Sequence, residues 1–327
     1  MSKLVTIYGG AGFVGRYIAQ RMAKEGWRVR VATRRPNEAM FVKPYGAVGQ
    51  VEPVLCNIRN DDSVRSVMKG ADGVVNCVGL LNELGANTFD ALQHEGAGRV
   101  ARIATEENVG QLVHFSAIGA DPESGSNYAR TKALGEADVL AEFPAAVILR
   151  PSVIFGAEDR FFNKFASMTQ FSPILALVGG RTKFQPVSVD DVAQAAAKGI
   201  LGQAGPGVYE LGGPDVRTLH ELADEMLTTI RRRRLVLNLP FWVGSITGGA
   251  LDIAQAVSLG LFANSILTRD QVRNLRNDNV VSDGALSLAD LGIKPVATQA
   301  TLPEYLWRYR PSGQYSSIKE SAKNLKV

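Results

Sequence analysis

The sequence LVTIYGGAGFVG, residues 4–15, joins a short apolar run to a glycine-rich loop. The apolar run predicts a buried strand, and the amphipathic segment that follows, residues 14–25, predicts a helix. Glycines at every third position allow a tight turn and let backbone amides at the helix N-terminus approach a pyrophosphate. Their spacing is GxxGxxG, not the GxGxxG of many dehydrogenases. The order strand, loop, helix predicts a dinucleotide site; the alternative is that the glycines serve only helix–strand packing.

Apolar runs and amphipathic segments alternate to about residue 150. Runs that are apolar on both faces and are separated by helices indicate a parallel sheet covered on both sides. Six such units predict a doubly wound α/β domain of the Rossmann type. The predicted strands are residues 4–8, 29–33, 51–56, 73–78, 112–116 and 146–149. The predicted helices are residues 14–25, 62–69, 88–107 and 128–142.

The pattern loosens after Gly156, which indicates a change of domain. We expect a Rossmann domain over residues 1–160 that is completed by about 181–215. Residues 161–180 and 216–327 are expected to form a smaller, mostly helical C-terminal domain with an interaction arm. The arm, residues 309–327, is polar and has little to bury, so we expect it to order on a neighbouring molecule.

The composition excludes several classes of protein. The chain has 327 residues, of which 46% are hydrophobic, and 36 basic against 32 acidic side chains give a net charge of +4. That charge is too small to indicate a nucleic-acid partner by itself. Two cysteines, Cys56 and Cys77, are too few for a disulfide framework and indicate a reducing compartment. The histidines lack metal-ligand spacing, so no metal site is expected; they are His94, His114 and His220.

The end of the second predicted strand bears on which dinucleotide binds. NAD sites usually place an Asp or Glu about 20 residues beyond the loop, where it holds the ribose 2′-hydroxyl. This chain has Thr33-Arg34-Arg35 at that point, with no acid. Arginine pairs with phosphate through a bidentate fork, and Arg16 adds a second positive group from the first helix. The residues favour NADPH over NADH, the alternative being that these arginines are solvated loop charges.

Several motifs together resemble the extended or atypical short-chain dehydrogenase/reductase (SDR) superfamily. They are residues 9–15, Val78-Gly79, Tyr128-Ala-Arg-Thr-Lys132 and Arg150-Pro151-Ser152. Further segments resemble one branch, the nucleotide-binding accessory subunits of respiratory complex I (NADH:ubiquinone oxidoreductase) and their bacterial relatives. These segments are residues 155–163, 184–192, 209–214, 267–281 and 305–310. The resemblance extends along nearly the whole chain.

The resemblance implies a function that composition and spacing do not. It implies a Rossmann domain with a tightly bound NADPH that is not turned over. It also implies docking on other complex I subunits of the peripheral arm, near the quinone site and the membrane surface. Since the first residues match neither an export signal nor a transit peptide, we expect a bacterial chain on the cytoplasmic side of the inner membrane. A processed organellar protein on the matrix side is the alternative.

The loop and the resemblance together predict a set of cofactor contacts along the ends of the strands. They are Gly9, Gly12, Phe13, Val14, Gly15, Arg16, Arg34, Arg35, Asn57, Ile58, Val78, Gly79, Ser116, Tyr128, Lys132, Pro151, Ser152 and Val153. Asn57 stands where the family usually has an Asp that contacts the adenine amine. Because an amide carbonyl also accepts a hydrogen bond, we expect this contact to be retained.

Tyr128 and Lys132 match the catalytic pair of the superfamily, one helical turn apart. The third member, a Ser or Thr that polarises the substrate carbonyl, falls on Ile118, which cannot donate a hydrogen bond. Losing such a donor costs on the order of 10²–10³ in rate. We therefore expect Tyr128 and Lys132 to be cofactor ligands first and vestigial catalysts second. Two alternatives stay open: an active NADPH-dependent reductase or epimerase, and a sensor of the NADPH/NADP⁺ ratio.

Four arginines, residues 231–234, precede an almost uncharged segment, residues 235–268. Its longest uncharged run has 17 residues and contains Pro240, whereas a membrane-spanning helix needs about 20 apolar residues. We therefore expect interfacial contact with lipid headgroups or with a partner subunit, and no span. The alternative is that the segment packs on the protein itself and that the arginines are a solvated helix end.

Overall fold

The computed structural model describes residues 2–258, 264 and 266–315. Its largest element is a seven-stranded sheet in the order β11-β6-β5-β4-β1-β2-β3, in which every pairing is parallel. The strands are β1 (Leu4–Tyr8), β2 (Arg28–Thr33), β3 (Val51–Leu55), β4 (Gly73–Asn76), β5 (Gln111–Phe115), β6 (Val147–Pro151) and β11 (Gly207–Leu211). The doubly wound parallel sheet is thereby confirmed, and the six predicted strands lie within two residues of the observed bounds.

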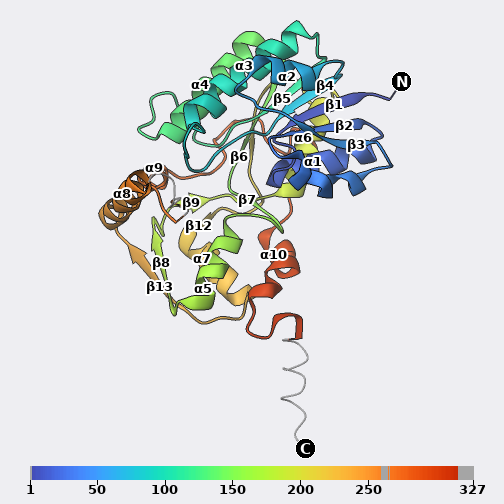
Figure 1. The fold of residues 1–327 in the computed structure, drawn as a ribbon. Helices are drawn as coiled ribbons and strands as arrows, with labels where there is room; N and C mark the ends of the chain where they lie inside the picture. The colour runs from blue at the N-terminus through green and yellow to red at the C-terminus, as the bar shows by residue number, and fades with distance from the viewer. Residues whose placement is uncertain (1, 259–263, 265, 316–327) are drawn as a thin grey trace, which may run out of the picture.

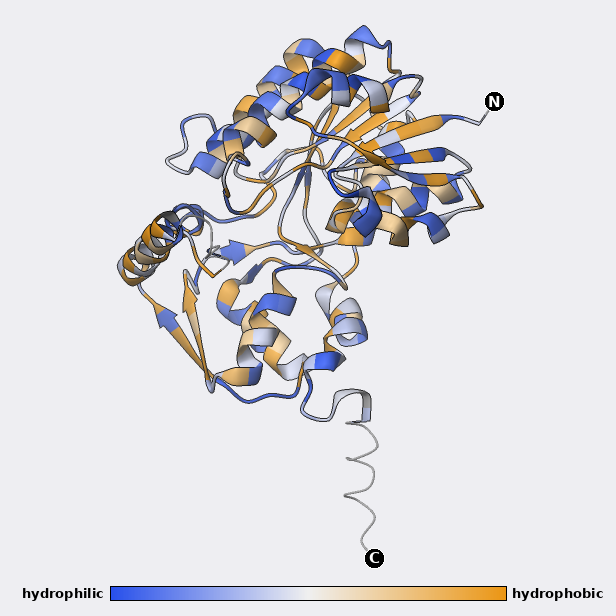
Figure 2. Ribbon diagram, viewed as in Figure 1, coloured by the Kyte–Doolittle hydropathy of each residue, from blue (hydrophilic) through white to orange (hydrophobic). Residues whose placement is uncertain are grey.

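Helices cover both faces of this sheet (Figure 1). One buried cluster joins the strands to α1 and α6 through Ile18, Met22 and Val192. A second cluster lies on the opposite face and joins them to α2, α3 and α4. The helices are α1 (Phe13–Lys24), α2 (Asp61–Met68), α3 (Glu95–Glu106), α4 (Asn127–Glu142) and α6 (Val189–Ile200), together with the non-α helical segments η1 (Pro36–Tyr45) and η2 (Asp90–His94). Figure 2 shows the apolar strands enclosed between helices whose outer faces are polar.

A second lobe lies below the carboxyl end of the sheet in Figure 1. Its helices are α5 (Phe162–Phe171), α7 (Leu219–Thr229), α8 (Phe241–Val257), α9 (Arg269–Asn274) and α10 (Thr298–Leu306), with η3 (Trp307–Tyr309) and η4 (Gly313–Tyr315). Its strands pair as β7 (Ile154–Phe155) with β10 (Val187–Ser188), β9 (Lys183–Phe184) with β12 (Arg217–Thr218), and β8 (Ile174–Val178) with β13 (Leu235–Leu239). The lobe is mainly helical as expected, but the parallel β8–β13 pair was not predicted.

Asp159 organises this second lobe. Its buried carboxylate accepts hydrogen bonds from the backbone amides of Phe161 and Asn163 and from the hydroxyl of Tyr305. Burial raises the pKa of Asp159 above its usual range, and these donors oppose that rise. The hydroxyl of Tyr309 also donates to the side-chain oxygen of Asn163, at 3.0 Å. Two of the segments on which the resemblance rests are therefore held together by these hydrogen bonds. They are residues 155–163 and 305–310.

The boundaries between the domains stay a prediction. Leu288, Leu291 and Ile293, which the sequence analysis assigned to the C-terminal domain, belong to the same buried cluster as β1. Most of the expected interaction arm, residues 316–327, lies outside the described residues. Among the residues that the structure describes, no helix is both long and apolar enough to cross a membrane.

Candidate functional site

The predicted site residues lie along the carboxyl edge of the sheet. Most of them follow β1, β2, β3, β4, β5 or β6 closely, whereas Tyr128 and Lys132 lie on α4. The strand order reverses between β1 and β4, which are neighbours in the sheet. In open α/β sheets, ligands bind in the crevice at this reversal, outside the carboxyl ends of the strands. The topology therefore gathers residues from six separate segments at one edge.

The glycine loop has the geometry that its sequence predicts. Gly9 has φ +75°, a left-handed conformation that favours glycine. A Cβ on Gly15 would lie 2.5 Å from the carbonyl oxygen of Gly9 and 2.6 Å from the Cα of Gly10. Only glycine therefore lets α1 begin this close to the turn. Gly12 is the N-cap of α1 and has no side chain to cap it, so the first amides face the carboxyl edge.

The three arginines predicted for a 2′-phosphate differ in their surroundings. Arg34 is exposed, and one of its nitrogens donates to Asn87 Oδ1 at 2.8 Å. Arg35 pairs with Glu38 at the surface, at 3.2 Å. Arg16 pairs with Glu158, also at 3.2 Å. No carboxylate within the described part of the chain pairs with Arg34, so it is the best placed of the three to receive a phosphate.

The loop between β4 and η2 holds two arginines, a feature that the sequence analysis missed. Besides the Arg34–Asn87 contact, Arg59 Nη1 donates to the carbonyl of Ala86 at 2.8 Å. Arg59 also reaches back to Asn57, whose Oδ1 accepts from its backbone amide at 3.2 Å. Asn57 is exposed, and the same oxygen also accepts from Arg59 Nε at 3.5 Å. Neighbouring Ile58 is buried. The position of Arg59, just after Asn57 at a strand end, was the available signal.

Lys132 and Ser116 lie at the centre of the edge. The ammonium of Lys132 donates to the carbonyl of Phe115 at 2.8 Å and lies 3.6 Å from where a Cβ on Gly79 would be. Burial lowers the pKa of Lys132 to about 8, an effect that the charge of Glu136 partly offsets. The hydroxyl of Ser116 is buried and has no hydrogen-bond partner among the described residues. An unpartnered buried hydroxyl fits a polar ligand group.

Tyr128 lacks the environment of a catalytic tyrosine. Burial raises the pKa of its phenol to about 12, and the Lys132 charge does not lower it. Its ring packs edge-on against Phe89, with centroids 5.8 Å apart. Ile118, in place of the polarising hydroxyl, is buried, and its carbonyl accepts from the side chain of Asn279 at 3.2 Å. Tyr128 and Lys132 are thus one helical turn apart, and the ammonium of Lys132 donates to the carbonyl of Phe115.

The predicted contacts after β6 lie in a structural joint. The hydroxyl of Ser152 donates to Asn279 Oδ1 at 2.7 Å and accepts from the backbone amide of Gln185 at 3.3 Å. The carbonyl oxygen of Val153 accepts a hydrogen bond from the backbone amide of Val187. Pro151 ends β6. Ser152 therefore connects the strand end to a distant segment, and its hydroxyl already has protein partners.

Asp270 anchors the helix that carries Tyr128; the sequence analysis included it only within the segment 267–281 and gave it no role of its own. Its Oδ1 accepts from the backbone amide of Asn127 at 2.8 Å. Its Oδ2 accepts from the Ser126 hydroxyl at 2.8 Å and from the Tyr128 amide at 3.2 Å. A carboxylate at a helix N-terminus satisfies free amides and complements the helix dipole. The residues that meet are more than 140 positions apart, which is why local pattern analysis missed the contact.

The arginines at residues 231–234 follow the end of α7, as expected. Arg232 and Arg234 donate to backbone carbonyls, those of Tyr309 and Thr169, so both are partly committed to the protein. Within the described ranges, no group of three His, Cys, Asp or Glu side chains could hold a metal ion. His114 is buried beside Asn76, and burial lowers its pKa to about 3.

Comparisons with known proteins cover most of the chain. Residues 5–212 match the model of the NAD dependent epimerase/dehydratase family. The Arabidopsis thaliana protein NADH dehydrogenase [ubiquinone] 1 alpha subcomplex subunit 9, mitochondrial, is 36% identical, over 95% of this chain and 79% of the relative. The Neurospora crassa NADH-ubiquinone oxidoreductase 40 kDa subunit is 30% identical, over 95% and 80%. A Bacillus anthracis dTDP-glucose 4,6-dehydratase in complex with NAD has the same fold, with TM-score 0.70 at 15% identity over 94% and 96%.

Proposed function

Because the chain belongs to the NAD dependent epimerase/dehydratase family, and within it to the group of the alpha subcomplex subunit 9 proteins, we propose that it is an accessory subunit of respiratory complex I. The observation that carries this proposal is similarity along nearly the whole chain. It includes the second lobe, where Asp159, Tyr305 and Tyr309 join two of the diagnostic segments. The partners are then other subunits of an NADH:ubiquinone oxidoreductase, in the peripheral arm near the quinone site.

The nucleotide of this subunit is NADPH. The left-handed Gly9, the close approach at Gly15 and the uncapped α1 N-terminus fit a pyrophosphate. Arg34, exposed and without a carboxylate partner within the described residues, fits a 2′-phosphate. The orphan hydroxyl of Ser116 and the ammonium of Lys132 supply polar groups on the nicotinamide side. NADPH can supply a hydride when bound, but the surrounding side chains give little help to such a transfer.

The nucleotide is held for structure and not turned over. Ile118 offers no hydrogen bond to a substrate carbonyl, and Tyr128, with a pKa near 12, is a weak acid in this setting. Lys132 points its ammonium at the carbonyl of Phe115 and leaves that phenol unassisted. A ligand that binds only the native state stabilises it through mass action, and this is the role we assign to NADPH.

An exposed apolar surface on α8 supports docking at the membrane or on a subunit beside it. Trp242, Ile246, Ile253 and Val257 are exposed and separated by four, seven and four residues, so they form one stripe along the helix. Two glycines of α8 face inward: a Cβ on Gly244 would lie 2.6 Å from Val178, and one on Gly248 would lie 2.9 Å from the backbone nitrogen of Arg269. A helix that packs glycines against the protein and exposes large apolar side chains to solvent presents a surface for contact with a partner. The subunit then sits peripherally on the cytoplasmic side of a bacterial inner membrane.

Purification from native membranes tests this proposal. The chain carries a tag at its own gene, the membranes are solubilised in mild detergent, and the co-purifying proteins are identified by mass spectrometry. We expect the flavin, iron–sulfur and quinone-site subunits of complex I in equal amounts. Replacing Trp242 and Ile246 with Ser should reduce their recovery, whereas Val216→Ser, an exposed apolar residue elsewhere, should not. Recovery of the chain alone, in the soluble fraction, would overturn the proposal.

A second candidate is an NADPH-dependent reductase, favoured by the retention of both Tyr128 and Lys132 one helical turn apart. The variant Tyr128→Phe separates the two candidates because it removes only the phenolic hydroxyl. For an accessory subunit we expect unchanged thermal stability and unchanged assembly. A carbonyl substrate whose reduction by NADPH is lost in this variant would establish the reductase.

A further inference from the structure

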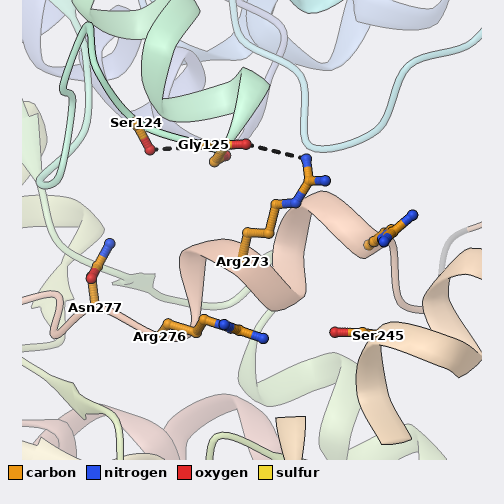
Figure 3. Close-up of a pocket in the computed structure, with 8 residues that line it drawn as sticks. Ser124, Gly125, Ser245, Arg273, Arg276 and Asn277 are labelled. Carbon is orange, nitrogen blue, oxygen red and sulfur yellow. Dashed lines mark hydrogen bonds between the residues drawn. The ribbon is translucent and has the colours of Figure 1, made fainter. Parts of the chain in front are cut away.

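A cavity of about 390 Å³ opens between α8, α9 and the loop that precedes α4 (Figure 3). It shares no residue with the nucleotide edge described above. The residues that line it are Ser124, Gly125, Ser126, Ser245, Arg269, Arg273, Arg276 and Asn277. Hydroxyl, amide and guanidinium groups thus surround it, and the lining contains no carboxylate side chain.

Three arginines give the cavity its charge. Arg269, Arg273 and Arg276 are spaced four and three residues apart, so they extend from one side of α9 and its continuation. None of them pairs with a carboxylate in the part of the chain that the structure describes. Like charges at this spacing destabilise a helix unless an anion lies among them.

The acids nearest to α9 already have other partners. Asp270 accepts from the Ser126 hydroxyl and from the first amides of α4. Asp252 accepts from the backbone amide of Arg269 at 3.0 Å and from the side chain of Asn264 at 2.8 Å. The two carboxylates therefore bind backbone amides and other side chains. The guanidinium groups of the cavity stay available to a ligand.

Contacts with the protein position the side chains of Arg273 and Arg276 and leave most of their N–H groups available to a ligand. Arg273 donates one N–H to the carbonyl of Gly125 at 3.2 Å, and Arg276 extends over the ring of Phe241 toward Ser245 (Figure 3). Gly248 fixes the approach of α8 to α9, since a Cβ there would lie 2.9 Å from the Arg269 backbone nitrogen. The walls of the cavity are therefore set by backbone contacts.

We propose that this cavity binds a phosphate group. Arginine forks match phosphate oxygens in bidentate geometry, and serine hydroxyls add neutral donors. The volume accommodates a small phosphomonoester, and Ser245 in the lining directly precedes Ile246 of the apolar stripe, so the phosphate of a lipid headgroup is a second source of the same chemistry. The shared chemistry is a tetrahedral, doubly or singly charged phosphate held by Arg269, Arg273 and Arg276. The inference stands apart from the proposed function.

Two binding measurements on the full chain test this. The first is calorimetric titration with glycerol 3-phosphate in the presence of saturating NADPH, so that the glycine loop does not compete. The second is sedimentation with vesicles of phosphatidylglycerol in phosphatidylcholine, and with phosphatidylcholine alone. The double variant Arg269→Ala/Arg273→Ala should weaken whichever binding occurs by about tenfold or more, the usual size of a lost charged hydrogen bond.

The matched control is Arg28→Ala/Arg160→Ala, which removes two exposed arginines elsewhere. A milder variant, Arg273→Lys, keeps the charge but loses the fork, and circular dichroism checks that each variant is folded. Loss of glycerol phosphate binding in the cavity variant alone supports a soluble ligand, and loss of vesicle binding alone supports a headgroup. The proposal would be overturned if the cavity and control variants lost the same affinity, or if the unaltered chain bound neither probe. It would also be overturned if Arg34→Ala, and not the cavity variant, reduced binding.

Discussion

Single residues at the carboxyl edge fall into two groups. Burial lowers the pKa of Lys132 to about 8 and that of His114 to about 3, and it raises the pKa of Tyr128 to about 12. Arg34, in contrast, is exposed and directly follows β2. The buried ammonium of Lys132 thus lies at the centre of the edge, and the exposed guanidinium of Arg34 lies at its outer end. This arrangement suits a dinucleotide whose extra phosphate marks that end.

Arg34→Ala should lower the affinity for NADPH. One charged hydrogen bond contributes about 2 kcal/mol, which corresponds to roughly a 30-fold change in Kd. The affinity for NADH should change little, because NADH has no phosphate at this position. Calorimetric titration with both nucleotides measures the difference, and Lys24→Ala, an exposed charge at the end of α1, is the control. Equal losses for NADPH and NADH would contradict the assignment of Arg34 to the 2′-phosphate.

His114 should make the protein sensitive to mild acid. Its folded-state pKa of about 3 lies below the ordinary value of 6.5, through burial first and the Lys132 charge second. Between these values the unfolded chain binds the proton and the folded chain does not, so stability falls as pH falls. From pH 6.5 to 5 the loss is about 2 kcal/mol. Urea unfolding at several pH values should show this slope reduced in His114→Gln, which can still accept from Asn76. An identical slope in both proteins would refute it.

Among the elements, the six-residue helix α9 connects distant parts of the chain. One of its side chains, Asp270, anchors the N-terminus of α4, and two others line the arginine cavity. Its own start is fixed by a capping box between Thr268 and Gln271. A helix this short is unstable alone, so its position depends on these contacts.

Asp270→Ala should destabilise the fold by about 2 kcal/mol. The change leaves the first amides of α4 and the Ser126 hydroxyl without their acceptor and removes a favourable charge from the helix N-terminus. Denaturant unfolding measures the loss. Asp283→Ala, an exposed acid nearby in sequence, should change stability by less than about 0.5 kcal/mol. Similar effects from the two substitutions would show that Asp270 has no anchoring role.

The elements also show where prediction from sequence succeeded. The β1–loop–α1 unit was predicted because strand, glycines and helix follow one another within 25 residues. The β8–β13 pair was missed because its partners are about 60 residues apart and because β13 lies inside an apolar run that resembled an interfacial segment. The site shows the same difference. Arg34 and Lys132 could be predicted because each belongs to a local sequence motif, whereas the contact of Asp270 with α4 depends on how the two lobes pack.

At the scale of the whole molecule, two lobes meet across the carboxyl edge of the sheet. Asn279 joins them, since it contacts Ser152 after β6 and the carbonyl of Ile118 after β5. A nucleotide along this edge would contact segments that are otherwise connected only through such joints. Binding of the nucleotide should therefore stabilise the two lobes together against unfolding.

NADPH at 100 times its Kd should raise the free energy of unfolding by about 2.7 kcal/mol, provided that it binds only the folded chain. Chemical denaturation with and without the nucleotide measures the gain. NADH at the same concentration should give a smaller gain, and Arg34→Ala should remove the difference between the two. A gain that is equal for both nucleotides would indicate that the extra phosphate is not recognised.

The outward face of α8 gives this protein a built-in optical reporter. Of its three tryptophans, Trp27 is 6% exposed, Trp307 is 39% exposed and Trp242, on the stripe, is 65% exposed. Indole emission shifts to shorter wavelength when water is excluded from the ring, and Trp27 is already shielded. Any surface that covers the stripe should therefore shift the emission of the whole protein mainly through Trp242. The unaltered protein would thus let assembly be followed in real time without a label, and a Trp242→Phe variant, which lacks this signal, would be the control.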